Sequence, residues 1–154
     1  MRAALFLLAV TALIAIGTAE ALVSNAQLAV LPGRARPALS GGGAALTAAG
    51  VALSAGVYAA FGIVLARRAT PERTAVPTGL AVGVAAGLVG GTIRAYLVSD
   101  YLREVLAGYG LADLTLASLA VFVVLSLLVS AAAGTAVTWL SFRAARPRTP
   151  RPPR

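Results

Sequence analysis

The chain has 154 residues, of which 59% are hydrophobic and 12% charged, and its formal net charge is +8. Soluble domains carry about 25% charged and about 45–50% apolar residues, so this composition excludes a water-soluble globule and indicates an integral membrane protein of one domain. The chain has no cysteine and no histidine, which excludes disulfides, cysteine-ligated metals and the commonest general base.

Four apolar stretches, bounded by charged or turn-forming residues, are long enough to cross a membrane as helices. They cover residues 3–23, 43–66, 78–98 and 114–142. At about 1.5 Å of rise per residue, each reaches the ~30 Å thickness of a hydrocarbon core, and the fourth exceeds it and is expected to tilt or project. The sequence therefore predicts an all-α bundle of four transmembrane helices within residues 1–142.

The first span has an alternative interpretation as a cleavable signal peptide. Arg2 precedes the apolar run, and small residues at Ala19 and Ala21, or at Ser24 and Ala26, resemble a cleavage site. The apolar run is longer than the ~7–15 residues of a usual signal core, which favours a retained span. Cleavage would leave three spans in the same orientation.

The connections between the spans contain proline, glycine and charged residues. Pro77 is well placed near the start of the third span. Residues 100–107 have the spacing of a short amphipathic helix, which we expect to lie in the membrane interface and to end at Gly108 and Gly110. The last residues, 143–154, are rich in arginine and proline and predict a disordered tail.

The distribution of arginine predicts the orientation. Nine arginines lie at one end of the predicted spans and three at the other, so both termini are expected in the cytoplasm. All basic residues are arginine, alongside abundant alanine, glycine and proline, which indicates a GC-rich bacterial genome and a multi-pass protein of the bacterial cytoplasmic membrane. The nine arginines are Arg2, Arg67, Arg68, Arg73, Arg143, Arg146, Arg148, Arg151 and Arg154, and the other three are Arg34, Arg36 and Arg103.

Small residues recur every four positions in three of the spans. Residues four apart share one face of a helix, so missing side chains form a groove along it, and such grooves are a main source of helix association in membranes. The stripes either pack against one another within one bundle, or dock onto another copy or another membrane protein. The glycine ladder is Gly79, Gly83, Gly87 and Gly91; the alanine stripe is Ala44, Ala48, Ala52, Gly56 and Ala60; the serine–threonine stripe is Ser126, Ser130, Gly134 and Thr138.

Two ionisable residues, Glu20 and Arg94, lie within the predicted spans. Counted along the helices, both lie at the same depth, ~6 Å inside the outer boundary. Charges are costly in lipid, so this coincidence predicts an ion pair between the two helices, with Asp100 and Glu104 as further acids within reach of Arg94. Snorkelling to the interface is one alternative. A transport or proton-relay role is another, for which one acid and one base are few.

The tail arginines are expected to contact anionic lipid headgroups, at ~1 kcal/mol each near the surface, although a simple topology signal would explain them equally well. No basic residues alternate with aromatics in the tail, so no nucleic-acid partner is expected. The five residues are Arg143, Arg146, Arg148, Arg151 and Arg154.

No catalytic motif, phosphate-binding loop or metal-ligand spacing occurs in the sequence, so we expect neither an enzyme nor a cofactor or metal site. Asp100 and Glu104 are four apart and could bind a cation, but a solvated helix face explains them better. The expected function is that of an accessory or assembly subunit, which docks onto a larger membrane complex through glycine-rich helix faces. The alternative is a homo-oligomeric channel or small-solute transporter, lined by the serine–threonine stripe and the region of Glu20 and Arg94.

Overall fold

The computed structural model describes residues 2–29, 41–68 and 70–146, and these residues form four long helices. The helices are α1 (Arg2–Ala29), α2 (Gly41–Arg67), α3 (Glu72–Gly108) and α4 (Thr115–Ala145), and a short 3-10 helix, η1 (Ala112–Leu114), precedes α4. The described ranges contain no strand, so the all-α class is confirmed for them. All four helices are long and apolar enough to cross a membrane.

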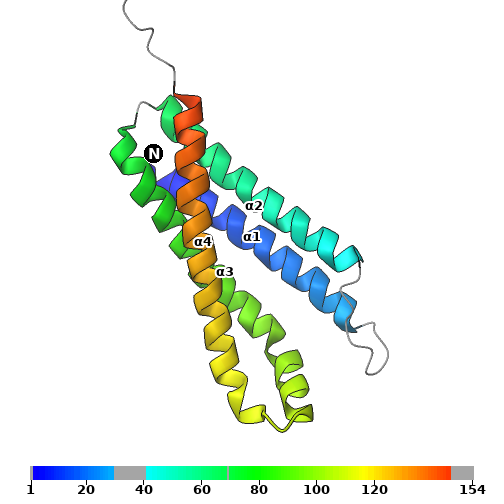
Figure 1. Ribbon diagram of the computed structural model, residues 1–154. Coiled ribbons are helices and arrows are strands. Elements are labelled where there is room, and N and C mark those ends of the chain that lie inside the picture. Colours follow the sequence, from blue (N-terminus) through cyan, green and yellow to red (C-terminus); the bar gives the residue numbers. More distant parts are fainter. Residues whose placement is uncertain (1, 30–40, 69, 147–154) are drawn as a thin grey trace, which may run out of the picture.

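The helices form two antiparallel hairpins, α1–α2 and α3–α4 (Figure 1). Helix α1 packs on α2 and α3, and α4 packs on α2 and α3. The hairpins converge at the end of the molecule that holds the start of α1, the α2–α3 connection and the end of α4, and they diverge toward the other end (Figure 1). Helix α1 therefore begins, and helix α4 ends, at the same end of the molecule. We name it the converging end.

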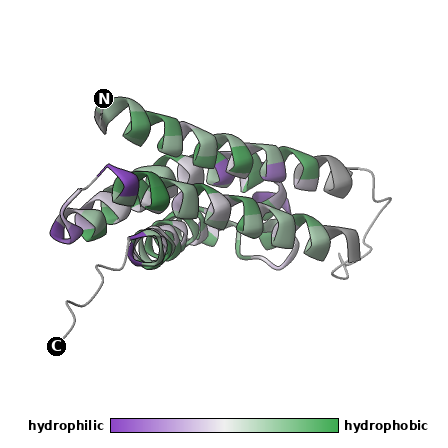
Figure 2. Ribbon diagram, turned by 90° about the horizontal axis from the view of Figure 1, so that it is seen from above, coloured by the Kyte–Doolittle hydropathy of each residue, from purple (hydrophilic) through white to green (hydrophobic). Residues whose placement is uncertain are grey.

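Hydrophobic residues occur along all four helices, as the hydropathy colouring of the ribbon shows (Figure 2), and many of their large apolar side chains are exposed. Leu8 is 69% exposed, Leu116 80% and Val129 67%. Soluble monomers do not expose large continuous apolar surfaces, whereas helices that are apolar all round are typical of membrane spans. The buried core combines alanines with larger side chains, which include Tyr58, Phe61, Leu65, Val82 and Phe142.

Helix α3 differs most from the prediction. It begins at Glu72, continues through Pro77 and ends at Gly108, so residues 100–107 are its last turns and the separate interfacial helix predicted there was wrong. No proline or glycine occurs between Gly91 and Gly108, so nothing interrupts the helix where the chain becomes polar. The predicted spans were defined by their apolar residues, and in α3 the apolar stretch ends before the helical backbone does.

A glycine reverses the chain between α3 and α4. The φ of Gly110 is 73°, a left-handed conformation that glycine adopts without strain. The N–H of Gly110 donates to the carbonyl of Ala107 at 3.0 Å, and the N–H of Leu111 donates to the carbonyl of Leu106 at 2.8 Å. These two bonds are those of a Schellman motif, which ends α3 and directs the chain back along it.

Candidate functional site

The glycine ladder of α3 packs against α4 of the same chain. All four of its glycines are buried. A Cβ atom added at Gly79 would lie 2.6 Å from the carbonyl oxygen of Gly134, and one added at Gly83 would overlap the carbonyl oxygen of Ser130. The backbones of α3 and α4 are therefore in direct contact, and the ladder is covered within the single chain.

The serine–threonine stripe of α4 faces this ladder and helix α2. Gly134 and Thr138 are buried, and a Cβ atom added at Gly91 would lie 2.9 Å from Cβ of Ser126. The hydroxyls of Tyr58 and Ser130 are 2.8 Å apart, and the Thr138 hydroxyl donates to the carbonyl of Tyr58 at 3.5 Å. Within the described residues, α3 therefore packs against this stripe, and α2 contacts it at Ser130 and Thr138.

The alanine stripe of α2, by contrast, faces outward. Its five members are all exposed, and a Cβ atom added at Gly56 would meet nothing within 4 Å. Of the two alternatives stated above, packing of all three stripes within one bundle therefore does not hold for this stripe. Helix α2 packs instead through a face that combines a glycine with bulky side chains. That face contains Tyr58, Phe61, Gly62 and Leu65, all of them buried.

The structure brings Glu20 and Arg94 together as an ion pair between α1 and α3. Nε of Arg94 also donates to the carbonyl oxygen of Gly17 at 3.1 Å. The Glu20 side chain is 16% exposed and that of Arg94 34%. Asp100 and Glu104 are exposed, and the polar contacts of Arg94 with the described residues go to α1 instead.

Helix α2 completes the surroundings of this pair. A Cβ atom added at Gly50 would lie 2.6 Å from Oε2 of Glu20, so glycine at this position leaves the space that the carboxylate occupies. The pair thus lies where three helices meet. Beyond it, Leu22 of α1 is 52% exposed and Tyr96 of α3 is 80% exposed.

A second cluster of charged residues, which is exposed, lies at the converging end. Nε of Arg143 forms a salt bridge with Oε1 of Glu72 at 2.9 Å, and Nη1 of Arg146 donates to Oε2 of Glu72 at 3.3 Å. The Arg143 guanidinium lies over the ring of Trp139, and that of Arg146 over the ring of Phe142. These two arginines are thus held against the protein surface. The other three arginines predicted to contact headgroups, Arg148, Arg151 and Arg154, lie outside the described residues.

Sequence reasoning missed the contacts between α2 and α4. A Cβ atom added at Gly62 would overlap the carbonyl of Thr138 and lie 3.1 Å from the backbone nitrogen of Phe142. A lone glycine gives no periodic signal, so its role was not visible in the sequence. Tyr58 did offer a signal in the sequence, because a hydroxyl within an apolar span needs a hydrogen-bonding partner.

Replacing Tyr58 with phenylalanine removes the hydrogen bond to Ser130. We expect the free energy of unfolding to fall by about 1 kcal/mol, because a buried hydrogen bond contributes that order of stability. Equilibrium unfolding in mixed detergent micelles measures the change. In the double variant with Ser130→Ala the two losses should not add, and strictly additive losses would show that the two hydroxyls do not interact.

Comparison with protein-family models, curated proteins and solved structures finds no match to this chain. The class of the protein therefore follows from its own features. In the described residues, four helices are long and apolar enough to span a membrane and carry exposed apolar side chains, which fits a helical protein of the multi-pass membrane type.

Proposed function

We propose that this chain is a small non-catalytic subunit that joins a larger membrane complex through the alanine stripe of α2. The observation that carries the proposal is the contrast between the stripes. The glycine ladder and the serine–threonine stripe are covered within the chain, whereas the alanine stripe is exposed along its length. Small residues let helix backbones approach closely, so this face suits a transmembrane helix of another protein.

Neighbouring side chains support the same face. Val51 is 64% exposed and Leu53 60%. They lie in the first half of α2, before Tyr58 and Gly62, which contact α4. A partner helix placed along the alanine stripe would cover apolar side chains and fit against a surface without bulky groups.

The proposed orientation places the converging end in the cytoplasm of a bacterial cell. Of the arginines in the described ranges, Arg67, Arg68, Arg73, Arg143 and Arg146 belong to helix ends or connections at the converging end, while Arg103 lies near the opposite end of α3. An excess of arginine in short connections favours the cytoplasmic side. Both ends of the chain would then lie in the cytoplasm.

Gly56→Leu tests the interface. We expect the wild-type protein, tagged and extracted with surrounding lipid from its own host, to appear in native mass spectrometry as a stoichiometric complex with one other membrane protein. The variant should lose at least about tenfold in complex yield, because a leucine blocks close helix approach. Its fold should be unchanged, since nothing lies within 4 Å of the added Cβ.

Gly90→Leu is the matched control, because it adds the same side chain at another open position, on α3 rather than α2. It should leave the complex intact. A wild-type chain that appears alone at 15.4 kDa would contradict the proposal. A closed homo-oligomer would contradict it as well and would favour a channel or transporter.

A further inference from the structure

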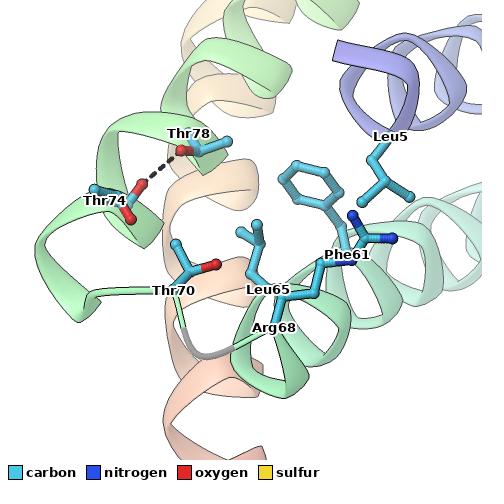
Figure 3. A pocket seen from close by; sticks show the side chains of 7 residues that line it. All are labelled: Leu5, Phe61, Leu65, Arg68, Thr70, Thr74 and Thr78. Atoms are coloured by element: carbon cyan, nitrogen blue, oxygen red, sulfur yellow. Dashed lines mark hydrogen bonds between the residues drawn. The ribbon is translucent and has the colours of Figure 1, made fainter. Parts of the chain in front are cut away.

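A cavity of about 230 Å³ lies at the converging end, between the start of α1, the end of α2 and the start of α3 (Figure 3). One side of it is apolar and is formed by Leu5, Phe61 and Leu65. The other side is formed by Thr70, Thr74 and Thr78, and the guanidinium of Arg68 lies beside Phe61 and Leu5 (Figure 3). Apolar side chains together with a cation and hydroxyls are the combination that an amphipathic ligand requires.

Arg68 supplies the positive charge of the cavity. Among the described residues, no carboxylate oxygen lies within 4.0 Å of its guanidinium, and the carboxylate of Glu72 is bound by Arg143 and Arg146. The charge of Arg68 is therefore available to a ligand, and it favours an anion. A guanidinium matches the geometry of phosphate oxygens especially well.

The threonines add hydrogen-bonding groups of two kinds. The Thr74 hydroxyl donates to the carbonyl of Pro71 at 2.7 Å, and the Thr78 hydroxyl donates to the carbonyl of Thr74 at 2.5 Å. With their protons used in this way, both oxygens keep lone pairs that can accept from a ligand. The hydroxyl of Thr70 points toward the interior of the cavity and can donate (Figure 3).

We propose that this cavity binds the headgroup of an anionic glycerophospholipid from the leaflet at the converging end. Arg68 and Thr70 bind the phosphodiester oxygens, Thr74 and Thr78 accept from headgroup hydroxyls, and the first carbons of an acyl chain lie along the apolar wall. The cavity is smaller than the ~300–1,000 Å³ of sites that enclose a whole ligand, so the acyl chains remain in the bilayer. The proposal rests on membrane insertion and is independent of the proposed partner.

Lipid binding to the purified full chain in detergent is measured by native mass spectrometry, with phosphatidylglycerol and phosphatidylcholine titrated separately. We expect one phosphatidylglycerol to bind at least about fivefold more tightly than phosphatidylcholine. Arg68→Gln should lower this affinity about tenfold, as expected for loss of a charge-assisted hydrogen bond. Arg73→Gln, which removes an exposed arginine at the same end but outside the cavity lining, should change it less than twofold.

Three results would overturn the proposal. Equal losses in Arg68→Gln and Arg73→Gln would show a diffuse attraction to the basic end rather than a site. Equal affinities for phosphatidylglycerol and phosphatidylcholine would show that the negative charge of the headgroup does not contribute to binding. Competition by glycerol phosphate or inorganic phosphate at the concentration of the lipid would identify a site for free phosphate compounds instead. Because no partner protein is present, failure here leaves the test of the alanine stripe unaffected.

Discussion

Gly83→Leu is expected to disrupt the packing of α3 on α4 and to lower the free energy of unfolding by about 3 kcal/mol or more. The added Cβ would overlap the carbonyl oxygen of Ser130 and lie 2.8 Å from Cα of Ala131. Both atoms belong to the backbone of α4, so no side-chain rotation relieves the overlap and the two helices must separate. Fluorescence of Trp139, the single tryptophan of the chain, reports unfolding in mixed detergent micelles.

Gly90→Leu separates this effect from the general consequence of a leucine on α3. Nothing lies within 4 Å of a Cβ atom at Gly90, so its free energy of unfolding should stay the same or rise slightly, because leucine favours helix more than glycine does. If Gly83→Leu unfolded at the same detergent fraction as Gly90→Leu, the close contact between α3 and α4 would be refuted.

Reversing either charge of the ion pair is the second large perturbation. In Glu20→Arg or Arg94→Glu, two like charges face each other among three helices, and we expect a loss of about 3 kcal/mol or more in the free energy of unfolding. The double variant Glu20→Arg/Arg94→Glu restores opposite charges and should recover part of the loss. The same unfolding titration measures all three variants.

Gly50 limits the space beside position 20, so an arginine there can destabilise the protein through its size as well as its charge. A second double variant therefore tests the pair without a long side chain at position 20. Glu20→Leu/Arg94→Leu removes both charges and uses a side chain shorter than arginine, and it should be close to wild type in stability, since an apolar pair can replace a buried ion pair. Glu104→Arg, at an exposed position on α3, is the control and should change stability by less than about 1 kcal/mol. If both double variants were as unstable as the single ones, the pairing of Glu20 with Arg94 would be refuted.

The features that sequence could anticipate are those in which a rare residue stands out against an apolar background. Glu20 and Arg94 are conspicuous because a charge in a span is costly unless it is paired, and their positions along the two helices gave them a common depth. Glycines at a spacing of four gave the packing face of α3 in the same way.

Other features depend on tertiary structure that no local pattern encodes. The alanine stripe of α2 has the same spacing as the glycine ladder, yet it is exposed, because the face with Tyr58 and Gly62 makes the contact with α4. A spacing of four small residues shows which faces of a helix permit close approach to another helix. Which face is buried also depends on the large side chains that the other faces of the same helix offer for packing. Alanine is also so frequent in this chain that such a stripe arises easily by chance.

The ends of the helices were unpredictable for a related reason. Hydropathy shows where the chain is apolar, whereas the helical backbone of α3 continues through polar residues as far as Gly108. Residues 100–107 therefore have the composition of an interfacial segment and the structure of a helix end. Arg146, predicted to lie in a disordered tail, is the C-cap of α4 and contacts Glu72 across a separation of 74 residues, a pairing with no local signature.

The separation in sequence between Glu20 and Arg94 is also 74 residues, and on the proposed topology it sets an order of events during synthesis. At about 5–20 residues per second, a ribosome needs roughly 4–15 s to make Arg94 after Glu20. During that interval α1 carries an acid into the bilayer before the helix that neutralises it exists. We therefore expect the first hairpin to stay near the insertion machinery until the third helix arrives. The ion pair thus couples the two hairpins during synthesis as well as in the folded structure.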